Sequence, residues 1–356
     1  MADSILDLAP SEGYARVERW VRERGLPSYR AEQIARRLWI TPTGAWNAAT
    51  ELPASLRVDL ETALPLTRLE VASHQVSQDG TQKYLWRLAD QEAIESVLIP
   101  SGTRRTLCIS SQAGCALGCV FCATGRMGFR RNLTPAEIAA QVREIVIRNP
   151  ADKPTNIVFM GMGEPLLNWP AVSTTLSILN DERGFGIGAR HITVSTVGIV
   201  PGMEALRQRP EQFRLAISLH SPHPEERLAL MPIEKKYPLA EVIEAARKFG
   251  RRVTFEYVLI QGRNDRDADA DALAHLARSL AAHVNLLPLH PGGSPGLTPS
   301  SGNRIRAFAD RLRSVGIEAV VRRSRGLDIN AACGQLYVEL EAKRRRDATA
   351  AVGRPG

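Results

Sequence analysis

From Gly102 onward the chain alternates short apolar segments with segments of helical periodicity, and this alternation restricts the fold more than any other feature. Strands separated by helical crossovers pair in parallel. About six strand–helix units are too few to close an eight-unit barrel. The pattern therefore predicts an α/β fold with an open or partial (βα)6 barrel over residues 101–340. Strand candidates lie near residues 107–110, 157–160, 192–195, 215–219, 253–259, 284–289 and 317–321.

The segments on either side of this barrel have different patterns. Residues 1–68 show apolar side chains at helical spacing, interrupted at Gly25-Leu26-Pro27, which predicts an N-terminal helical accessory domain. Residues 69–100 change to a β pattern with the turn signal Asp79-Gly80, which predicts a small β segment linking the two domains. Residues 341–356 are basic and lack core-forming periodicity, so we expect a disordered tail.

Charge and cysteines gather in the same two windows. Residues 102–149 hold seven arginines and two glutamates, and residues 322–356 hold eight basic and four acidic residues. These windows contain all five cysteines, which favours a positive face that carries thiol chemistry and attracts a polyanion. The alternative is a scattered, solvated surface.

The cellular compartment follows from what the sequence lacks. An odd number of cysteines without a secretion signal argues against a disulfide framework and for metal or redox chemistry. No segment approaches the roughly 18 apolar residues of a spanning helix. The sequence predicts a cytoplasmic protein without membrane association.

The strongest motif is a loop of three cysteines. Cys115, Cys119 and Cys122 are separated by three and two residues. Three such thiolates can each hold one iron of a cubane cluster and leave the fourth iron without a protein ligand. A structural zinc site would need a fourth ligand, which Cys108 could supply. The spacing and the preceding strand favour the cluster.

Other polar residues follow predicted strands. Gly163 and Glu164 follow an apolar strand, where small residues admit a ligand to the backbone and a carboxylate can meet an ammonium group. Ser195 and the group Ser218-Leu219-His220 also lie at strand ends, where this architecture binds ligands. Taken alone, each of these residues would be an ordinary turn residue.

Three further residues receive no catalytic role from pattern alone. Alternation in residues 93–99 makes an exposed strand glutamate the simplest interpretation of Glu95. Cys333 could be a buried, inert thiol, and Cys108 an additional thiol for the cluster.

Read together, these segments resemble the RlmN/Cfr family of radical S-adenosylmethionine RNA methyltransferases. The similarity extends from the N-terminal helices to about Leu340, and so many matches in one order exceed chance. Besides Cys108 and the cysteine loop, the matching segments are Asp79-Gly80-Thr81, Lys83-Tyr84-Leu85-Trp86, residues 160–165, Val194-Ser195-Thr196, Met231-Pro232, Lys236-Tyr237-Pro238-Leu239, Arg325-Gly326 and Ala331-Ala332-Cys333-Gly334-Gln335.

The resemblance implies two cofactors, a [4Fe-4S] cluster and S-adenosylmethionine. It assigns the cluster to Cys115, Cys119 and Cys122, with S-adenosylmethionine on the open iron. Relatives usually carry asparagine where this chain has His290, and an imidazole differs in geometry and titration, which leaves room for altered substrate choice. The implied contacts to S-adenosylmethionine are Gly163, Glu164, Ser195, Ser218, Leu219, His220 and, more weakly, His290.

The activity implied by the resemblance is methylation of adenine C2 in 23S ribosomal RNA, and possibly in tRNA. Carbon 2 is electron-poor, so its chemistry needs a radical. One S-adenosylmethionine methylates Cys333, and a second gives a radical that activates this methyl group for addition to adenine. Glu95 then removes the ring hydrogen, and Cys108 attacks the Cys333 sulfur, leaving a disulfide and freeing the RNA.

The family also implies an electron donor such as flavodoxin or ferredoxin and a monomeric chain. Two alternatives stay open at this point. One is C8 methylation of the Cfr type, although the N-terminal helices and Glu95 favour C2. The other is a noncatalytic, zinc-containing RNA-binding module.

Overall fold

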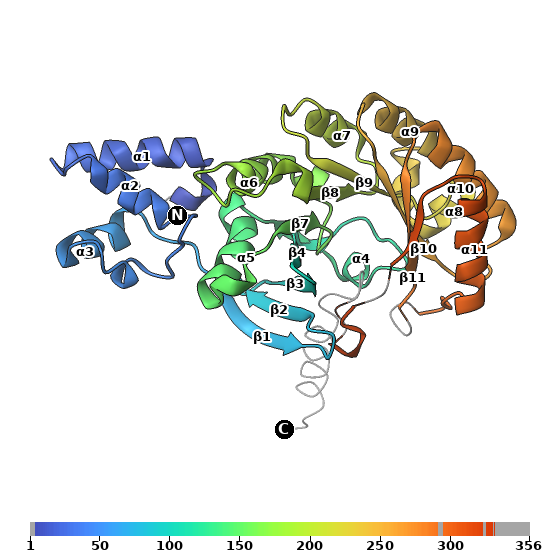
Figure 1. Cartoon of the computed structure of the whole chain (residues 1–356), viewed down its shortest axis with the longest axis horizontal. Helices are drawn as coiled ribbons and strands as arrows, with labels where there is room; N and C mark the ends of the chain where they lie inside the picture. The colour runs from blue at the N-terminus through green and yellow to red at the C-terminus, as the bar shows by residue number, and fades with distance from the viewer. Residues whose placement is uncertain (1–3, 291–294, 323–324, 330, 332–356) are drawn as a thin grey trace, which may run out of the picture.

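The computed structural model describes residues 4–290, 295–322, 325–329 and 331 (Figure 1). Within these residues, one sheet contains ten strands, and all strands from β4 to β12 in its order pair in parallel. In spatial order, the strands are β1 (Glu70–Val76), β2 (Gln82–Arg87), β3 (Ala93–Ser101), β4 (Arg104–Cys108), β7 (Asn156–Phe159), β8 (Ile192–Thr196), β9 (Arg214–Ser218), β10 (Thr254–Leu259), β11 (His283–Pro288) and β12 (Ala319–Val321).

Helices form the crossovers between successive parallel strands and lie along the outer side of the curved sheet (Figure 1). Two of them, α8 and α9, share the connection from β9 to β10. The predicted partial (βα)6 barrel is confirmed by this order. The crossover helices are α5 (Pro135–Arg148), α6 (Trp169–Asn180), α7 (Val200–Arg207), α8 (Pro224–Leu230), α9 (Leu239–Lys248), α10 (Asp267–Ser279) and α11 (Gly302–Ser314).

Smaller elements fill the loops of this framework. A two-stranded sheet of β5 (Gln112–Cys115) and β6 (Gly128–Asn132) flanks the short helix α4 (Ala123–Met127). The 3-10 helices are η1 (Ile5–Asp7), η2 (Trp46–Ala48), η3 (Pro150–Asp152), η4 (Pro165–Asn168), η5 (Ala189–His191), η6 (Pro232–Lys235) and η7 (Leu327–Ile329).

Helix α5 begins at the capping box that the sequence predicts. The Thr134 hydroxyl accepts a hydrogen bond from the Glu137 N–H, and the Glu137 carboxylate accepts one from the Thr134 N–H. Pro135 occupies the first turn, where its missing N–H is not needed. This local chemistry fixes where the first crossover helix starts.

Three helices lie near the N-terminus, α1 (Pro10–Glu23), α2 (Tyr29–Arg36) and α3 (Ala54–Ala63), and the segments that follow α2 and α3 contact α5 of the barrel (Figure 1). The fully buried Arg143 of α5 donates hydrogen bonds to the carbonyl oxygens of Leu38, Thr43 and Thr67, at 2.8, 3.0 and 3.4 Å. No helix in the described ranges has the length and apolar character needed to cross a lipid bilayer.

Residues 70–101 form the antiparallel end of the barrel sheet, because β3 pairs with β4 through Val97 and Cys108. On the side facing α5, Trp86 donates a hydrogen bond to Ser96, which donates one to Gln141 of α5, at 2.9 and 2.7 Å. Side chains alternate across a strand, so Lys83 and Glu95 lie on the opposite face of the sheet.

Candidate active site

The candidate site lies at the C-terminal edge of the parallel strands. Strands β4, β7, β8, β9 and β11 all end there. Most of the predicted site residues in the described ranges lie at these ends or in the loops that follow, whereas Glu95 lies within β3. The carboxyl ends of parallel strands share one edge, so the fold brings together segments that are far apart in the sequence.

The cysteine loop leaves β5 and enters α4. Cys115 and Cys119 are buried, whereas Cys122 is partly exposed and precedes the first residue of α4. Gly114 has a φ of +75°, and a Cβ at this position would collide with the Gly128 carbonyl oxygen. The turn therefore requires glycine directly before the first cysteine.

The three thiols are close together, because Cys122 acts on the ionisation of both Cys115 and Cys119. Burial raises the pKa of Cys115 to about 12 and that of Cys119 well above its usual value, and Cys122 and Glu164 raise both further. These thiols need nearby positive charge to ionise, and iron supplies such charge. The donor set therefore fits an iron–sulfur cluster.

Among the residues that the structure describes, no three His, Cys, Asp or Glu side chains converge as ligands of a single metal ion would. A cubane cluster does not require three side chains around one metal ion, because each thiolate binds a different iron.

Glu164 connects two loops of the site. Its carboxylate accepts hydrogen bonds from the N–H groups of Leu166 and Val197, at 3.1 and 2.9 Å. Its own N–H donates to the Gln112 side chain at 2.8 Å. Burial raises the pKa of Glu164 to about 7, against the lowering effect of these hydrogen bonds. Gly163, directly before it, has a φ of +96° and leaves no room for a side chain beside Gln112.

Ser195, Ser218, Leu219 and His220 lie at the adjacent ends of β8 and β9. The His220 Nδ1 accepts a hydrogen bond from the Val258 N–H at 3.0 Å, and its ring contacts Phe121 of the cysteine loop edge-on, with centroids 4.6 Å apart. Burial, with a smaller effect of Arg227, lowers the pKa of His220 to about 3. At neutral pH the ring is therefore neutral and carries its proton on Nε2.

We expect His220 to make folding sensitive to mild acid. The unfolded state binds a proton at His220 near pH 6.5, whereas the folded state binds it only near pH 3. The free energy of unfolding therefore decreases as the pH falls from 6.5 toward 3. The loss at pH 5 is about 2 kcal/mol. In His220→Asn, the amide oxygen can accept the Val258 hydrogen bond, and asparagine tolerates the φ of +55°.

Urea unfolding at pH 7 and pH 5 measures this effect as the difference between the native chain and His220→Asn. An equal loss of stability in both chains would show that His220 does not contribute.

Glu95 is buried, with 4% of its surface exposed. The interpretation of this residue as an exposed strand glutamate is therefore wrong, because the face of the sheet that carries Glu95 is covered, and Lys83 and Cys108 on that face are buried too. Its carbonyl accepts a hydrogen bond from the Ser110 hydroxyl at 2.6 Å, which in turn accepts one from the Met162 N–H at 2.9 Å. Ser110 thus connects the Glu95 backbone to the segment before Gly163.

Cys108 is also buried and pairs with Val97 in the β3–β4 register. Paired residues share a face of the sheet, so Cys108 and Glu95 project toward the same side. His290 follows β11, and its buried Nδ1 has no hydrogen-bond partner among the residues that the structure describes. Cys333 and residues 341–356 lie outside the described residues.

Sequence analysis missed the buried ion pair of Arg227 with Glu234 beside the cysteine loop. Arg227 also donates a hydrogen bond to the Val197 carbonyl at 2.6 Å, and Val120 of the cysteine loop donates one to Leu230 at 3.1 Å. No local motif marks these residues, because only the packing of α8 against the loop gives them a role.

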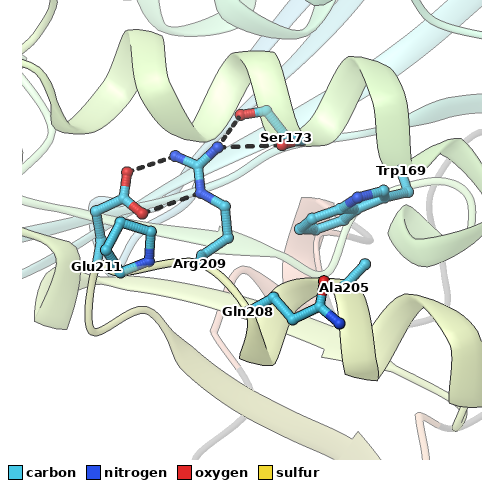
Figure 2. Close-up of a pocket in the computed structure, with 7 residues that line it drawn as sticks. Trp169, Ser173, Ala205, Gln208, Arg209 and Glu211 are labelled. Atoms are coloured by element: carbon cyan, nitrogen blue, oxygen red, sulfur yellow. Dashed lines mark hydrogen bonds and ion pairs between the residues drawn. The ribbon is translucent and has the colours of Figure 1, made fainter.

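A cavity of about 460 Å³ opens between α6 and the end of α7, lined by Trp169, Arg209 and Glu211 among others (Figure 2). Arg209 is paired with Glu211 at 2.5 Å and donates hydrogen bonds to Ser173 and Ser177. None of the predicted site residues in the described ranges lines this cavity. The candidate active site is therefore the strand-end region around the cysteine loop.

Residues 109–274 match the family model of the radical SAM superfamily. A probable dual-specificity RNA methyltransferase RlmN from Gemmatimonas aurantiaca is 58% identical over 96% of this chain and 94% of its own length. The dual-specificity RNA methyltransferase RlmN of Anaeromyxobacter dehalogenans is 43% identical over 93% of this chain and 92% of its own length. A crystal structure of a radical SAM methyltransferase from Sphaerobacter thermophilus, 46% identical, superposes with a TM-score of 0.88 and covers 94% of this chain and 99% of that one.

Proposed function

Because the chain belongs to the RlmN family of radical S-adenosylmethionine RNA methyltransferases, we propose that it methylates C2 of adenine in both 23S ribosomal RNA and tRNA. The observation that carries this proposal is the 58% identity to an RlmN relative, whose name specifies dual specificity, over 96% of the chain. We also propose that the chain acts as a cytoplasmic monomer with an electron donor such as flavodoxin or ferredoxin.

In this proposal Cys115, Cys119 and Cys122 hold a [4Fe-4S] cluster. When bound, the cluster and S-adenosylmethionine supply the radical that the unreactive adenine carbon requires. Cys122 contributes to the raised pKa values of both Cys115 and Cys119, which supports a shared site, and those two raised values are typical of buried thiols that ionise only beside positive charge. The proposed contacts to S-adenosylmethionine are Gly163, Glu164, Ser195, Ser218, Leu219, His220 and His290.

The remaining steps use side chains of the protein. Cys333 carries the methyl group and becomes joined to the RNA. Glu95 accepts the ring hydrogen of carbon 2 as a proton. The Cys108 thiolate then attacks the Cys333 sulfur, so that an S–S bond forms and the S–C bond to the RNA breaks, and the released carbon keeps the bonding pair and takes up a proton to become the methyl group. The burial of Glu95 and Cys108 on one face of the sheet supports a shared role for these two residues.

The cluster assignment predicts a brown protein with about four irons per chain after anaerobic purification. Cys119→Ala should lose this iron and its absorption, because one corner of the cluster loses its thiolate. Cys108→Ala is the matched control and should keep the iron. Colourless protein with one zinc, lost in both variants, would contradict the cluster and indicate a zinc site that uses Cys108.

The position of methylation is tested by mass spectrometry of nucleosides from ribosomal RNA and tRNA treated with the reconstituted enzyme. We expect 2-methyladenosine from both RNAs. 8-Methyladenosine would instead assign the chain to the Cfr type of chemistry, and product from one RNA alone would refute dual specificity.

A further inference from the structure

Lys83 belongs to one of the segments that match the RlmN/Cfr family, yet the proposed mechanism gives it no role. The structure buries this lysine almost completely, with 5% of its surface exposed. Its Nζ lies 4.0 Å from the Glu95 Oε1, and the two side chains are 6% and 5% exposed. A buried lysine is rare without a partner, because its charge loses the hydration that water provides.

The strand register explains how these two charges meet. Lys83 pairs with Val97 and Leu85 pairs with Glu95 in the β2–β3 ladder, so Lys83 and Glu95 are diagonal neighbours on one face. Cys108 pairs with the same Val97 from the other side and joins them on that face. Arg87, farther along β2, is also on this face but is exposed.

The opposite face of these strands packs against α5. It is filled by Tyr84 and Trp86, whose rings stack with centroids 5.0 Å apart, and by the Ser96 hydroxyl beneath α5. Lys83 and Glu95 are therefore held on the side where Cys108 lies.

The separation of 4.0 Å determines what Lys83 can do for the carboxylate. It exceeds the 2.7–3.2 Å range of an N–H···O hydrogen bond but lies within the range where opposite charges stabilise each other. Burial alone favours a neutral glutamic acid, which cannot accept a proton. A neighbouring ammonium group favours the carboxylate and leaves its oxygen lone pairs able to receive one.

We propose that Lys83 is a positioning residue that keeps the buried Glu95 ionised and directed to the face of the sheet it shares with Cys108. This inference rests on the proposed function, in which a Glu95 oxygen takes the proton from adenine carbon 2 while the bonding electron pair stays with the ring. Lys83 itself does not touch the reacting carbon.

The test uses the full-length, cluster-loaded protein with ribosomal RNA, S-adenosylmethionine and a reductant. Covalent protein–RNA adduct is measured on denaturing gels, methylated adenine by mass spectrometry, and iron by analysis of each variant. We expect Lys83→Met to make about 10- to 100-fold less methylated adenine, because general-base catalysis is worth about that much or more. We expect adduct to accumulate in Lys83→Met, as in Glu95→Gln, because the ring proton is not removed.

Two further variants separate positioning from stability. Lys83→Arg keeps the positive charge and should restore resolution of the adduct. Lys248→Met removes an exposed lysine of α9 and should behave as the native chain. A purely structural role would lower iron and adduct together. If Lys83→Met fails to fold, the same three measurements are made on Lys83→Gln, which is also neutral but polar.

The outcomes distinguish this inference from the function on which it rests. If adduct accumulates in Glu95→Gln but the folded neutral Lys83 variant behaves as the native chain, the role of Lys83 is overturned. The proposed function is not affected by that result. Absence of both adduct and methylated adenine from the native chain and from Glu95→Gln would overturn the proposed function and, with it, this inference.

Discussion

Cys333→Ala is expected to reduce the yield of methylated adenine to background while leaving iron content and binding of S-adenosylmethionine unchanged. In the proposed mechanism the transferred carbon passes through the Cys333 sulfur, and alanine has no atom that can carry it. The measurement is mass spectrometry of ribosomal RNA after reaction with reconstituted enzyme, S-adenosylmethionine and reductant. Cys333 lies outside the described residues, so this expectation depends on the family and not on geometry.

Cys108→Ala is the matched control for this prediction. It should also lose methylated adenine, but it should retain the RNA as a covalent adduct because the displacing thiolate is missing. Cys333→Ala should form no adduct at all. Equal product from Cys333→Ala and the native chain would exclude the methyl-carrier role.

Arg143→Met is expected to lower the free energy of unfolding by about 3 kcal/mol or more. Arg143 is fully buried, and burial lowers the pKa of its guanidinium to about 10, which leaves it charged at neutral pH. Methionine fills similar space but cannot donate to the carbonyls of Leu38 and Thr43, and each unsatisfied buried acceptor costs about 1–3 kcal/mol. Urea unfolding followed by circular dichroism measures the change.

The control for this prediction is Arg148→Met on the same helix. The Arg148 side chain is 44% exposed and lies 4.0 Å from Glu144, so its loss should cost less than about 1 kcal/mol. Limited proteolysis should also cleave Arg143→Met faster within residues 38–67, where the carbonyls lose their donor. Equal stability of the two variants would show that the hydrogen bonds of Arg143 do not stabilise the packing of the N-terminal segment on the barrel.

Local sequence patterns were sufficient to predict the barrel. Each strand candidate after Gly102 overlaps a strand of the structure, and Thr134 and Glu137 form the predicted capping box. Strand alternation, helical periodicity and capping depend on residues a few positions apart. The spacing of the three cysteines is equally local, so the sequence alone could indicate the kind of cofactor.

Burial and charge pairing depended on the tertiary structure. An alternating pattern shows that Glu95 faces one side of its strand, but not that this side is covered. In the folded chain Glu95 lies on a face of the sheet where Lys83 and Cys108 are buried as well. Likewise, 105 residues separate Arg143 from the Leu38 carbonyl. Local periodicity predicts which side chains share a face of a strand or helix. The desolvation of a charged group and its partners depend on segments that meet only when the chain folds.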